Sequence, residues 1–338
     1  MKATAIDAIR CPITHSTLEL IEITHQAEDE IITGQLINKD GRIFKIVNGI
    51  IDFVIMDEEE KNQYAISLFK EKAKSYDEYQ HLSFETFYKD ENTVRNELID
   101  KLRLIPASKV LEVNAGTGRD SILIAKRLSK DGLLHVQDIS ADMLFYCKEK
   151  LKNVSVPYLI HQSNASVLPY ENQLFDSVYS FGGVGMNTYS DNKKAIKEMV
   201  RVTKAGGRIV FGGLSLAPWL RNTLFGKVLV NHNPHYANNI SFDDLPIEAR
   251  ELNVSWILNG AGFVVDFTVG EGEPSANFNY EIPGPRGGTL FTRFYGQLEG
   301  VTNETKKLAY EASEKLGISM HKWLDEVIKE EAIKIKNQ

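Results

Sequence analysis

The chain has 338 residues, of which 43% are hydrophobic, so it is long enough for a catalytic domain with appended elements. Its 46 Asp and Glu residues outnumber its 39 Lys and Arg residues, which gives a formal net charge of −7. This balance argues against nucleic acid as a partner, because phosphate-backbone binding draws its affinity from clustered basic residues.

The cysteine count and the hydropathy pattern narrow the class of protein further. Cys11 and Cys147 are the two cysteines, so neither a disulfide framework nor a multi-cysteine metal site is expected. No stretch approaches the roughly 18 apolar residues of a membrane span, and the first residues lack the apolar run of a signal peptide. The sequence therefore predicts a cytoplasmic protein with no membrane partner.

Three regions follow one another along the chain. Short β-like runs at 18–23, 34–37 and 43–47 predict a small β-rich unit over residues 1–56. Residues 57–104 are rich in Glu, Lys and Tyr at helical spacing, which predicts a helical lead-in to the next domain. The tail, residues 301–338, reads as a helical hairpin that breaks at Leu316-Gly317 and restarts at a Ser319 cap.

From residue 109 the pattern becomes strand, turn and helix. The expected elements are strands at 110–113, 133–138, 158–162, 175–181 and 207–212, and helices at 120–128, 141–151 and 193–202. Such alternation predicts an α/β fold with a parallel sheet covered on both faces. A helix near 246–258 and strands at 263–269 and 289–295 are expected to complete this domain, which spans 57–300.

The sharpest motif is an apolar strand that runs into a glycine turn and a helix, VLEVNAGTGRD at 110–120. Gly116 and Gly118 let the backbone approach a ligand closely beyond the carboxyl end of the strand. Asp138 ends the next strand, where a carboxylate can accept hydrogen bonds from ribose hydroxyls. These features predict a nucleotide-binding crevice.

Two residues decide which nucleotide fits. The acidic Glu112 repels a pyrophosphate but suits a cationic ligand with an amino group. Ser121 stands where the dinucleotide fingerprint has a glycine for close helix packing. The pattern therefore favours a cationic nucleoside over a dinucleotide.

The motif resembles the first motif of the class I S-adenosylmethionine-dependent methyltransferases, an acidic residue followed by alternating glycines. Asn114 replaces the family's first glycine, and asparagine tolerates the left-handed conformation. Segments at 138–144, 164–170, 175–185 and 198–208 resemble the later motifs in order, so the resemblance covers about residues 76–270. At the third motif Asn164 stands where the family commonly has an aspartate that accepts from the adenine amino group, and an amide oxygen can also accept.

The resemblance implies a doubly wound Rossmann-like sheet of seven strands, the last antiparallel, and S-adenosylmethionine as the cofactor. It also implies the cofactor-binding residues Tyr76, Glu112, Asn114, Ala115, Gly116, Thr117, Gly118, Asp138, Ile139, Met143, Asn164, Ala165, Phe181 and Gly182. Tyr76 belongs to a Tyr-Asp pair seen near the donor carboxylate in small-molecule methyltransferases, and an ordinary helix-face tyrosine is the alternative.

The N-terminal unit resembles the zinc ribbon that precedes some methyltransferases, including ribosomal RNA enzymes, but lacks its ligands. Thr14 stands at the position paired with Cys11, and Asn38 and Gly41 lie near the expected second pair. We expect no metal in this unit.

An insert at about 215–245 is dense in aromatic and amide side chains, which suits a lid over a substrate. Its Trp219 and Tyr236 are candidates for substrate binding, and His232 and His235 for a general base. A solvated loop histidine is the alternative for each. Arg286, in a Pro-Gly turn segment, is a candidate for binding an acceptor carboxylate, or it shapes the turn.

The tail helix at 320–328 carries an apolar stripe that we expect to pack on the body or on a partner, which leaves a homodimer open. The preferred function is methyl transfer from S-adenosylmethionine to an O, N, S or C atom of a small molecule. An RNA methyltransferase and a non-catalytic S-adenosylmethionine-binding protein are the alternatives.

Overall fold

An eleven-stranded sheet organises the first part of the chain, in the order β1-β2-β3-β4-β7-β6-β5-β8-β9-β11-β10. The computed structural model describes residues 1–54, 67, 73–183, 189–238, 241–295 and 302–337. They fall into two compact units, Met1–Pro274 and Ser275–Gln338. Within the described residues, no helix has the length and apolar character needed to cross a membrane.

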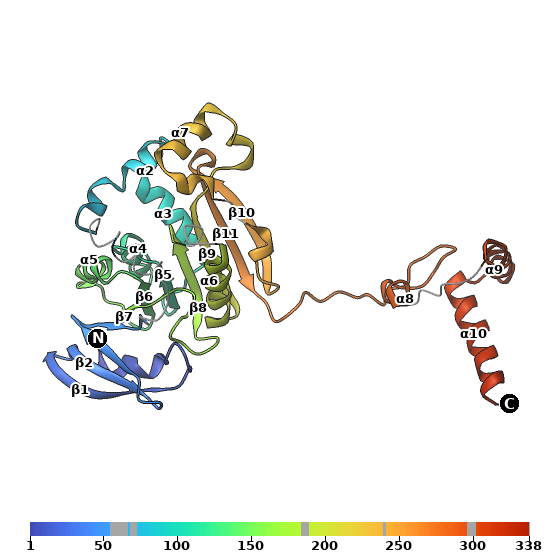
Figure 1. Cartoon of the computed structure of the whole chain (residues 1–338), viewed down its shortest axis with the longest axis horizontal. Coiled ribbons are helices and arrows are strands. Elements are labelled where there is room, and N and C mark those ends of the chain that lie inside the picture. The colour runs from blue at the N-terminus through green and yellow to red at the C-terminus, as the bar shows by residue number, and fades with distance from the viewer. Residues whose placement is uncertain (55–66, 68–72, 184–188, 239–240, 296–301, 338) are drawn as a thin grey trace. The chain divides into compact units, whose positions relative to one another are not determined.

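The strands and helices of the first unit alternate along most of its length (Figure 1). The strands are β1 (Leu18–Ala27), β2 (Glu30–Asn38), β3 (Ile43–Val47), β4 (Ile50–Asp52), β5 (Lys109–Val113), β6 (Leu133–Asp138), β7 (Tyr158–Gln162), β8 (Phe175–Phe181), β9 (Thr203–Leu214), β10 (Ala249–Ile257) and β11 (Gly262–Val269). The α-helices are α2 (Leu82–Glu85), α3 (Glu91–Asp100), α4 (Arg119–Ala125), α5 (Ala141–Leu151), α6 (Tyr189–Val202) and α7 (Leu224–His232). Short 3₁₀ turns are η1 (Ala3–Ala8), η2 (Pro218–Leu220), η3 (Pro234–Ala237), η4 (Phe242–Asp244) and η5 (Leu258–Gly260).

Strands β5 to β11 form the predicted doubly wound sheet. The pairs β7-β6, β6-β5, β5-β8 and β8-β9 are parallel, and β11 runs antiparallel to both β9 and β10. The seven-stranded α/β fold with an antiparallel last strand is therefore confirmed. Parallel neighbours bring the carboxyl ends of β5, β6 and β8 to one edge, where ligands bind in such sheets.

Two elements were predicted wrongly. The helix near 246–258 is strand β10, and the strand at 289–295 is helix α8 (Leu290–Tyr295). Strand β10 lies at the sheet edge and is only half covered, so its apolar residues do not alternate cleanly. Of the helical lead-in, 55–66 and 68–72 lie outside the described residues, while 73–79, α2 and α3 are helical.

Both faces of the sheet are buried, because alternate strand residues enter two different apolar clusters. On one face, Val110 and Val136 pack with residues of α3, α4 and α5. On the other face, Leu111 and Phe211 pack with residues of α6 and of the N-terminal strands. This double coverage explains the almost continuous apolar runs that allowed these strands to be predicted.

The N-terminal strands extend this sheet. Strands β1, β2, β3 and β4 pair antiparallel in succession, and β4 then pairs in parallel with β7. In Figure 1, β1 and β2 lie at the lower end of the first unit. Buried Cys11 lies 3.3 Å from the amide nitrogen of Asn38, and no described group of three His, Cys, Asp or Glu residues is arranged to hold a metal ion.

A polar network is buried between the N-terminal strands and the central sheet. The Tyr170 hydroxyl lies 2.9 Å from Nδ1 of His135 and 2.5 Å from Nε2 of His161, and all three side chains are fully buried. The second ring nitrogens, His135 Nε2 and His161 Nδ1, have no hydrogen-bond partner among the residues that the structure describes. Burial lowers the pKa of both imidazoles, so both are neutral in the folded protein.

Acid is expected to destabilise the protein through this network. Burial, with a smaller effect of Lys109, lowers the pKa of His135 from 6.5 to about 3. The unfolded chain therefore binds more protons below its own pKa, so this contribution to stability is complete above pH 6.5 and is lost as the pH falls toward about 3. At about pH 5 the loss is about 2 kcal/mol.

Urea unfolding at about pH 7.5 and about pH 5 measures this loss. The variant His135→Phe should lose about 2 kcal/mol less than wild type between the two pH values. His25→Phe is the matched control because His25 lies exposed on β1. An equal acid loss in wild type and His135→Phe would contradict the assignment.

The second unit contains α8, α9 (Asn303–Leu316) and α10 (Met320–Lys336). Gly317 ends α9 with φ 65°, and the Ser319 side chain accepts from the Lys322 backbone N–H at the start of α10. The predicted break and cap are therefore confirmed. On the apolar stripe of α10, Met320 is buried, whereas Val327 and Ile328 are 43% and 41% exposed.

Candidate functional site

The glycine turn lies between β5 and α4 at the carboxyl edge of the sheet. Asn114, Gly116 and Gly118 all have left-handed backbone, with φ of 58°, 56° and 81°. The expectation that asparagine replaces a glycine by adopting this conformation is confirmed. A side chain at Gly183 would collide with the amide of Asn114, so Asn114 lies against the loop that follows β8.

Open space lies beside two glycines of this edge. A Cβ built on Gly116 or on Gly182 meets no atom of the described residues within 4 Å. By contrast, a Cβ on Gly118 would lie 3.0 Å from Cα of Cys147, because the start of α4 packs on α5. The glycines after β5 and β8 therefore leave room for a ligand, whereas Gly118 serves helix packing.

Asp138 borders the same space from the end of β6. Its Oδ2 accepts from the Gly116 backbone N–H at 2.8 Å, and its Oδ1 accepts from the Ser140 backbone N–H at 2.9 Å. Burial raises the pKa of Asp138, while these backbone donors oppose the rise. Each oxygen keeps a lone pair for a further donor, such as a ribose hydroxyl.

Glu112 lies beneath the turn. Its side chain is only 2% exposed and accepts a short hydrogen bond from the Ser121 hydroxyl. Burial, and then the nearby charge of Asp120, raises the pKa of Glu112 well above its usual value. A cation bound above the turn would favour the ionised form of this acid.

The loop after β7 reaches the same edge. The Ser163 backbone N–H donates to the Asp138 carbonyl at 3.1 Å, and the side-chain oxygen of Asn164 accepts from the Ser166 backbone N–H at 2.8 Å. The Asn164 oxygen is thereby oriented within its own turn. Ala165 is buried beside it.

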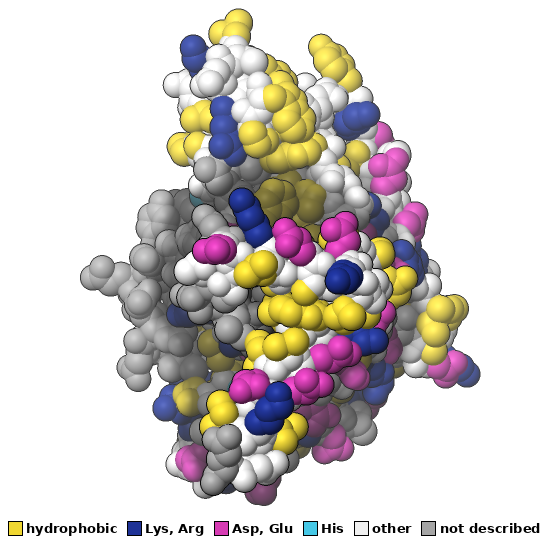
Figure 2. All heavy atoms as spheres, turned by 90° about the vertical axis from the view of Figure 1, so that its right-hand side faces the viewer, with side chains coloured by type: hydrophobic (Ala, Val, Ile, Leu, Met, Phe, Trp, Pro, Cys, Tyr) yellow, Lys and Arg dark blue, Asp and Glu magenta, His cyan; other side chains and the backbone are white. Residues whose placement is uncertain are grey.

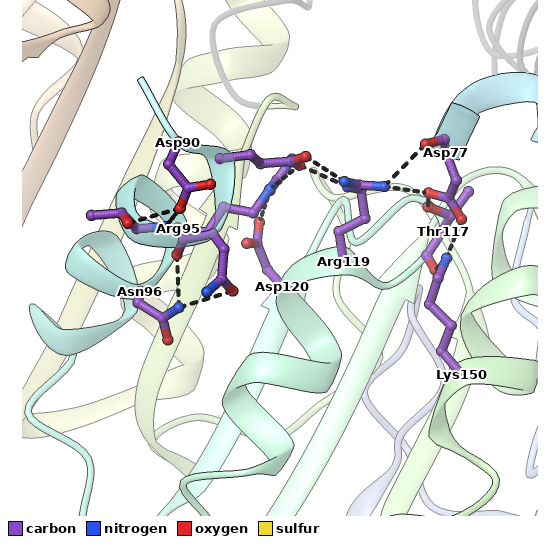
Figure 3. A network of polar contacts seen from close by, with 11 residues as sticks. Asp77, Asp90, Arg95, Asn96, Thr117, Arg119, Asp120 and Lys150 are labelled. Carbon is purple, nitrogen blue, oxygen red and sulfur yellow. Dashed lines mark hydrogen bonds and ion pairs between the residues drawn. The ribbon is translucent and has the colours of Figure 1, made fainter. Parts of the chain in front are cut away.

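Charged side chains join the helical lead-in to the turn (Figure 3). Asp77 accepts from the Thr117 hydroxyl at 2.6 Å, from Arg119 at 3.2 Å and, in a short contact, from Lys150. Lys150 also donates to the Thr117 carbonyl at 2.6 Å. Residue 77 and the neighbouring half-buried Tyr76 are thus fixed next to the glycine turn.

Arg95 of α3 is the functional candidate that sequence reasoning missed. Its guanidinium pairs with Glu91 and with Asp120, both at 2.6 Å, and is nearly buried. It also lies over the rings of Phe84 and Phe181, 5.3 and 5.8 Å from their centroids. Burial opposes its charge, but Asp120, Tyr179 and Glu91 outweigh this effect and raise the pKa of Arg95. Arg95 therefore supports Phe181 at the end of β8.

The insert after β9 contains η2, α7, η3 and η4. The Leu216 backbone N–H donates to the Tyr236 carbonyl at 2.9 Å, so η3 lies beside the carboxyl end of β9. His232 ends α7 and is exposed, whereas His235 is half-buried with its Nδ1 3.4 Å from the Asn238 amide nitrogen. Tyr236 is buried. Their roles stay predictions.

The outer surface of the insert is apolar. Trp219 is 65% exposed and lies edge-on to Trp256, and Leu224 is 79% exposed. At the top of Figure 2, where α7 lies in Figure 1, hydrophobic side chains gather with Lys and Arg side chains among them. Arg286 belongs to the second unit, where its carbonyl accepts from the His321 backbone N–H at 3.3 Å. Its binding role also stays a prediction.

Comparison with known proteins relates this fold to a methyltransferase family. Residues 57–217 match the model of the ubiE/COQ5 methyltransferase family. The chain carries a class I S-adenosylmethionine-dependent methyltransferase domain. The match spans the helical lead-in, the glycine turn and strands β5 to β9.

Two relatives illustrate the similarity of this methyltransferase domain. The chain is 36% identical over 118 residues to a demethylmenaquinone methyltransferase of Bacillus mycoides, covering 34% of this chain and 48% of that protein. It is 32% identical over 161 residues to the ubiquinone/menaquinone biosynthesis C-methyltransferase UbiE of Haemophilus ducreyi, covering 47% of this chain and 60% of that protein. The chain thus spans about half the length of these relatives.

Among solved structures, phosphoethanolamine N-methyltransferase 2 of Haemonchus contortus in complex with S-adenosyl-L-methionine has a TM-score of 0.45 to this chain. The identity is 13%, with 60% of each chain covered. The methyltransferase domain brings together, at one sheet edge, Asn114, Gly116, Asp138, Asn164, Phe181 and Gly182 of the predicted cofactor residues.

Proposed function

We propose that this chain transfers a methyl group from S-adenosylmethionine to a small-molecule acceptor. The observation that carries the proposal is the buried Asp138 carboxylate beside Gly116, with open space over Gly116 and Gly182 at the carboxyl edge of the sheet. A carboxylate, backbone N–H groups and glycine clearance are what a ribose and its attached chain require. The residues present therefore fit the donor.

The donor, when bound, supplies an electrophilic methyl group on a sulfonium. The residues of the chain then hold and orient the methyl donor and the acceptor, because alignment of the two accelerates a direct displacement most. In this proposal Asp138 accepts hydrogen bonds from the ribose and Asn164 accepts one from the adenine amino group. The contacts of Asp138 with Gly116 and of Asn164 with Ser166, which orient the two side chains, support these roles. Phe181 ends β8 and Asn114 lies against the loop that follows it, the loop that resembles the family's fourth motif, which borders the reacting methyl in that family.

The names of the relatives support a proposal for the class of acceptor. Their names describe methyl transfer to demethylmenaquinone and carbon methylation in ubiquinone and menaquinone biosynthesis. We therefore propose a ring carbon of a quinol-type compound as the first acceptor to test. The exposed apolar side chains of the insert suit a lipophilic acceptor of this kind.

Replacement of Asp138 by alanine is expected to weaken donor binding by about 1–3 kcal/mol, because two ribose hydroxyls lose a charge-assisted acceptor. Titration calorimetry with S-adenosylmethionine and with S-adenosylhomocysteine measures this loss. Asp131→Ala, exposed before the start of β6, is the matched control and should bind as wild type does. Wild-type protein that gives no heat with either compound would refute the proposed function.

A further inference from the structure

The loop that carries Asn164 is anchored by a side chain that no binding role has explained. Residues 163–170 leave β7 beside Asp138 and end at Tyr170, whose ring is fully buried. The Tyr170 hydroxyl reaches His135 on β6 and His161 on β7, at 2.9 and 2.5 Å. One side chain thus ties the far end of the loop to two strands of the donor edge.

The hydrogen-bonding capacity of these groups fixes the three side chains relative to one another and allows two proton arrangements. A hydroxyl has one proton, so it donates to one imidazole and must accept from the other. Both imidazoles are neutral and fully buried, and within the described part of the chain the second nitrogen of each has no partner. Rotation of Tyr170 would add two further unpaired buried groups, which costs about 1–3 kcal/mol each.

The N-terminal unit packs against the network and the loop. The Phe53 ring lies edge-on to His161 with centroids 5.8 Å apart, and the Phe53 backbone N–H donates to the Gln162 carbonyl at 2.8 Å. The Arg10 backbone N–H donates to the Pro169 carbonyl at 2.8 Å. Residues 1–54 therefore hold both ends of the loop, and the parallel pairing of β4 with β7 holds the strand that precedes it.

Helix α6 also holds the far end of the loop. Glu198 accepts from the Leu168 backbone N–H at 2.8 Å, and Arg201 donates to the Leu168 and Tyr170 carbonyls at 3.0 and 2.7 Å. The Asn164 turn begins next to Asp138, because the Ser163 backbone N–H donates to the Asp138 carbonyl at 3.1 Å. The contacts of the loop with Tyr170, the N-terminal unit and helix α6 therefore constrain the position of this turn.

We propose that Tyr170, His135 and His161 form a positioning network that fixes the Asn164 turn and thereby sets the selectivity of this site for adenine over other bases. The proposal rests on the proposed function, because it assumes that Asn164 faces the adenine amino group. The network does not touch the ligand. It acts by holding the side-chain oxygen of Asn164 at the position of the adenine amino group. A displacement of about 1 Å is enough to lose the hydrogen bond between them.

The test compares two ligands in the full chain. S-adenosylhomocysteine carries the adenine amino group, and S-inosylhomocysteine replaces it with a carbonyl oxygen. Wild type should prefer the adenosyl compound by about 5- to 100-fold, the range that one buried hydrogen-bond pair supplies. Tyr170→Phe should lower this ratio by about 5-fold or more through weaker binding of the adenosyl compound alone.

A second variant and a control separate positioning from general loss of stability. Phe53→Leu loosens the packing on His161 without removing a polar group, and it should lower the same ratio if Tyr170→Phe fails to fold. Tyr158→Phe removes a hydroxyl at the opposite end of β7 and should leave the ratio unchanged. The measured quantity is the ratio of the affinities for the two compounds. A loss of stability that weakens the binding of both compounds equally leaves this ratio unchanged.

An unchanged ratio in folded Tyr170→Phe and Phe53→Leu would overturn the positioning network while leaving the proposed function intact. Wild type that binds neither compound would overturn both. Wild type that binds both equally would show that Asn164 does not read the amino group, and the network would then have no such role.

Discussion

Replacement of Arg95 by methionine is expected to lower the free energy of unfolding by about 3–5 kcal/mol, because it leaves the buried Asp120 carboxylate without its cation and leaves Glu91 paired with Arg119 alone. Arg95 pairs with Glu91 and Asp120 at 2.6 Å, with side chains no more than about a tenth exposed. Methionine fills a similar volume between Phe84 and Phe181, so the loss reports the charge more than the packing.

Two comparisons sharpen this measurement. Arg103→Met breaks an exposed pair with Glu251, with side chains 64% and 65% exposed, and should cost about 0.5 kcal/mol or less. The double variant Arg95→Met with Asp120→Asn should regain part of the lost stability, since one unpaired charge is removed. Denaturant unfolding gives all three values. A cost for Arg95→Met as small as that for Arg103→Met would show that the buried network does not stabilise the fold.

Much of the fold could be predicted because its strands are buried on both faces. Strands β6, β7 and β8 are short runs rich in aliphatic and aromatic residues and bounded by turns, and their predicted limits match the structure. The same periodicity failed at β10, where an edge strand is only half covered. It failed again at α8, because the residues of this short helix favour strands. The Thr289 hydroxyl accepts from the Thr292 backbone N–H and thereby caps the helix.

The candidate site likewise contains residues that the sequence could predict and one that it could not. The glycine turn and Asp138 could be found because the residue types are unusual and their spacing along the chain is short. Arg95 could not, since a basic residue within ENTVRNEL has the pattern of a solvated helix face. Its partner Asp120 lies 25 positions later, and only the packing of α3 on α4 joins them. Local sequence carries no signal for a pair that tertiary structure creates.

The N-terminal unit shows a further limit. The lost cysteine pairs predicted a unit without metal, but nothing in the sequence indicated that β4 would join β7. A three-residue strand, Ile50–Asp52, is too short to give a period. That pairing makes the unit part of the same sheet as the methyltransferase domain.

Replacement of one of the two lid histidines is expected to lower the rate of methyl transfer by about 10²–10⁴-fold, with little change in donor affinity, if that residue accepts the nucleophile's proton. His232 ends α7 with an exposed ring, and His235 lies in η3 beside the carboxyl end of β9. An amide hydrogen bond from Asn238 to Nδ1 of His235 would leave Nε2 protonated, which favours His232 as the base.

His232→Ala and His235→Ala would each be assayed for transfer to a demethylated quinol, and for binding of S-adenosylhomocysteine by calorimetry. His25→Ala, exposed on β1, controls for the loss of an unrelated imidazole. A base should also impose a rising limb on the pH–rate profile that its alanine variant lacks. Wild-type rates in both lid variants would mean that the acceptor's proton leaves to solvent, and that transfer in this domain depends on the alignment of donor and acceptor alone.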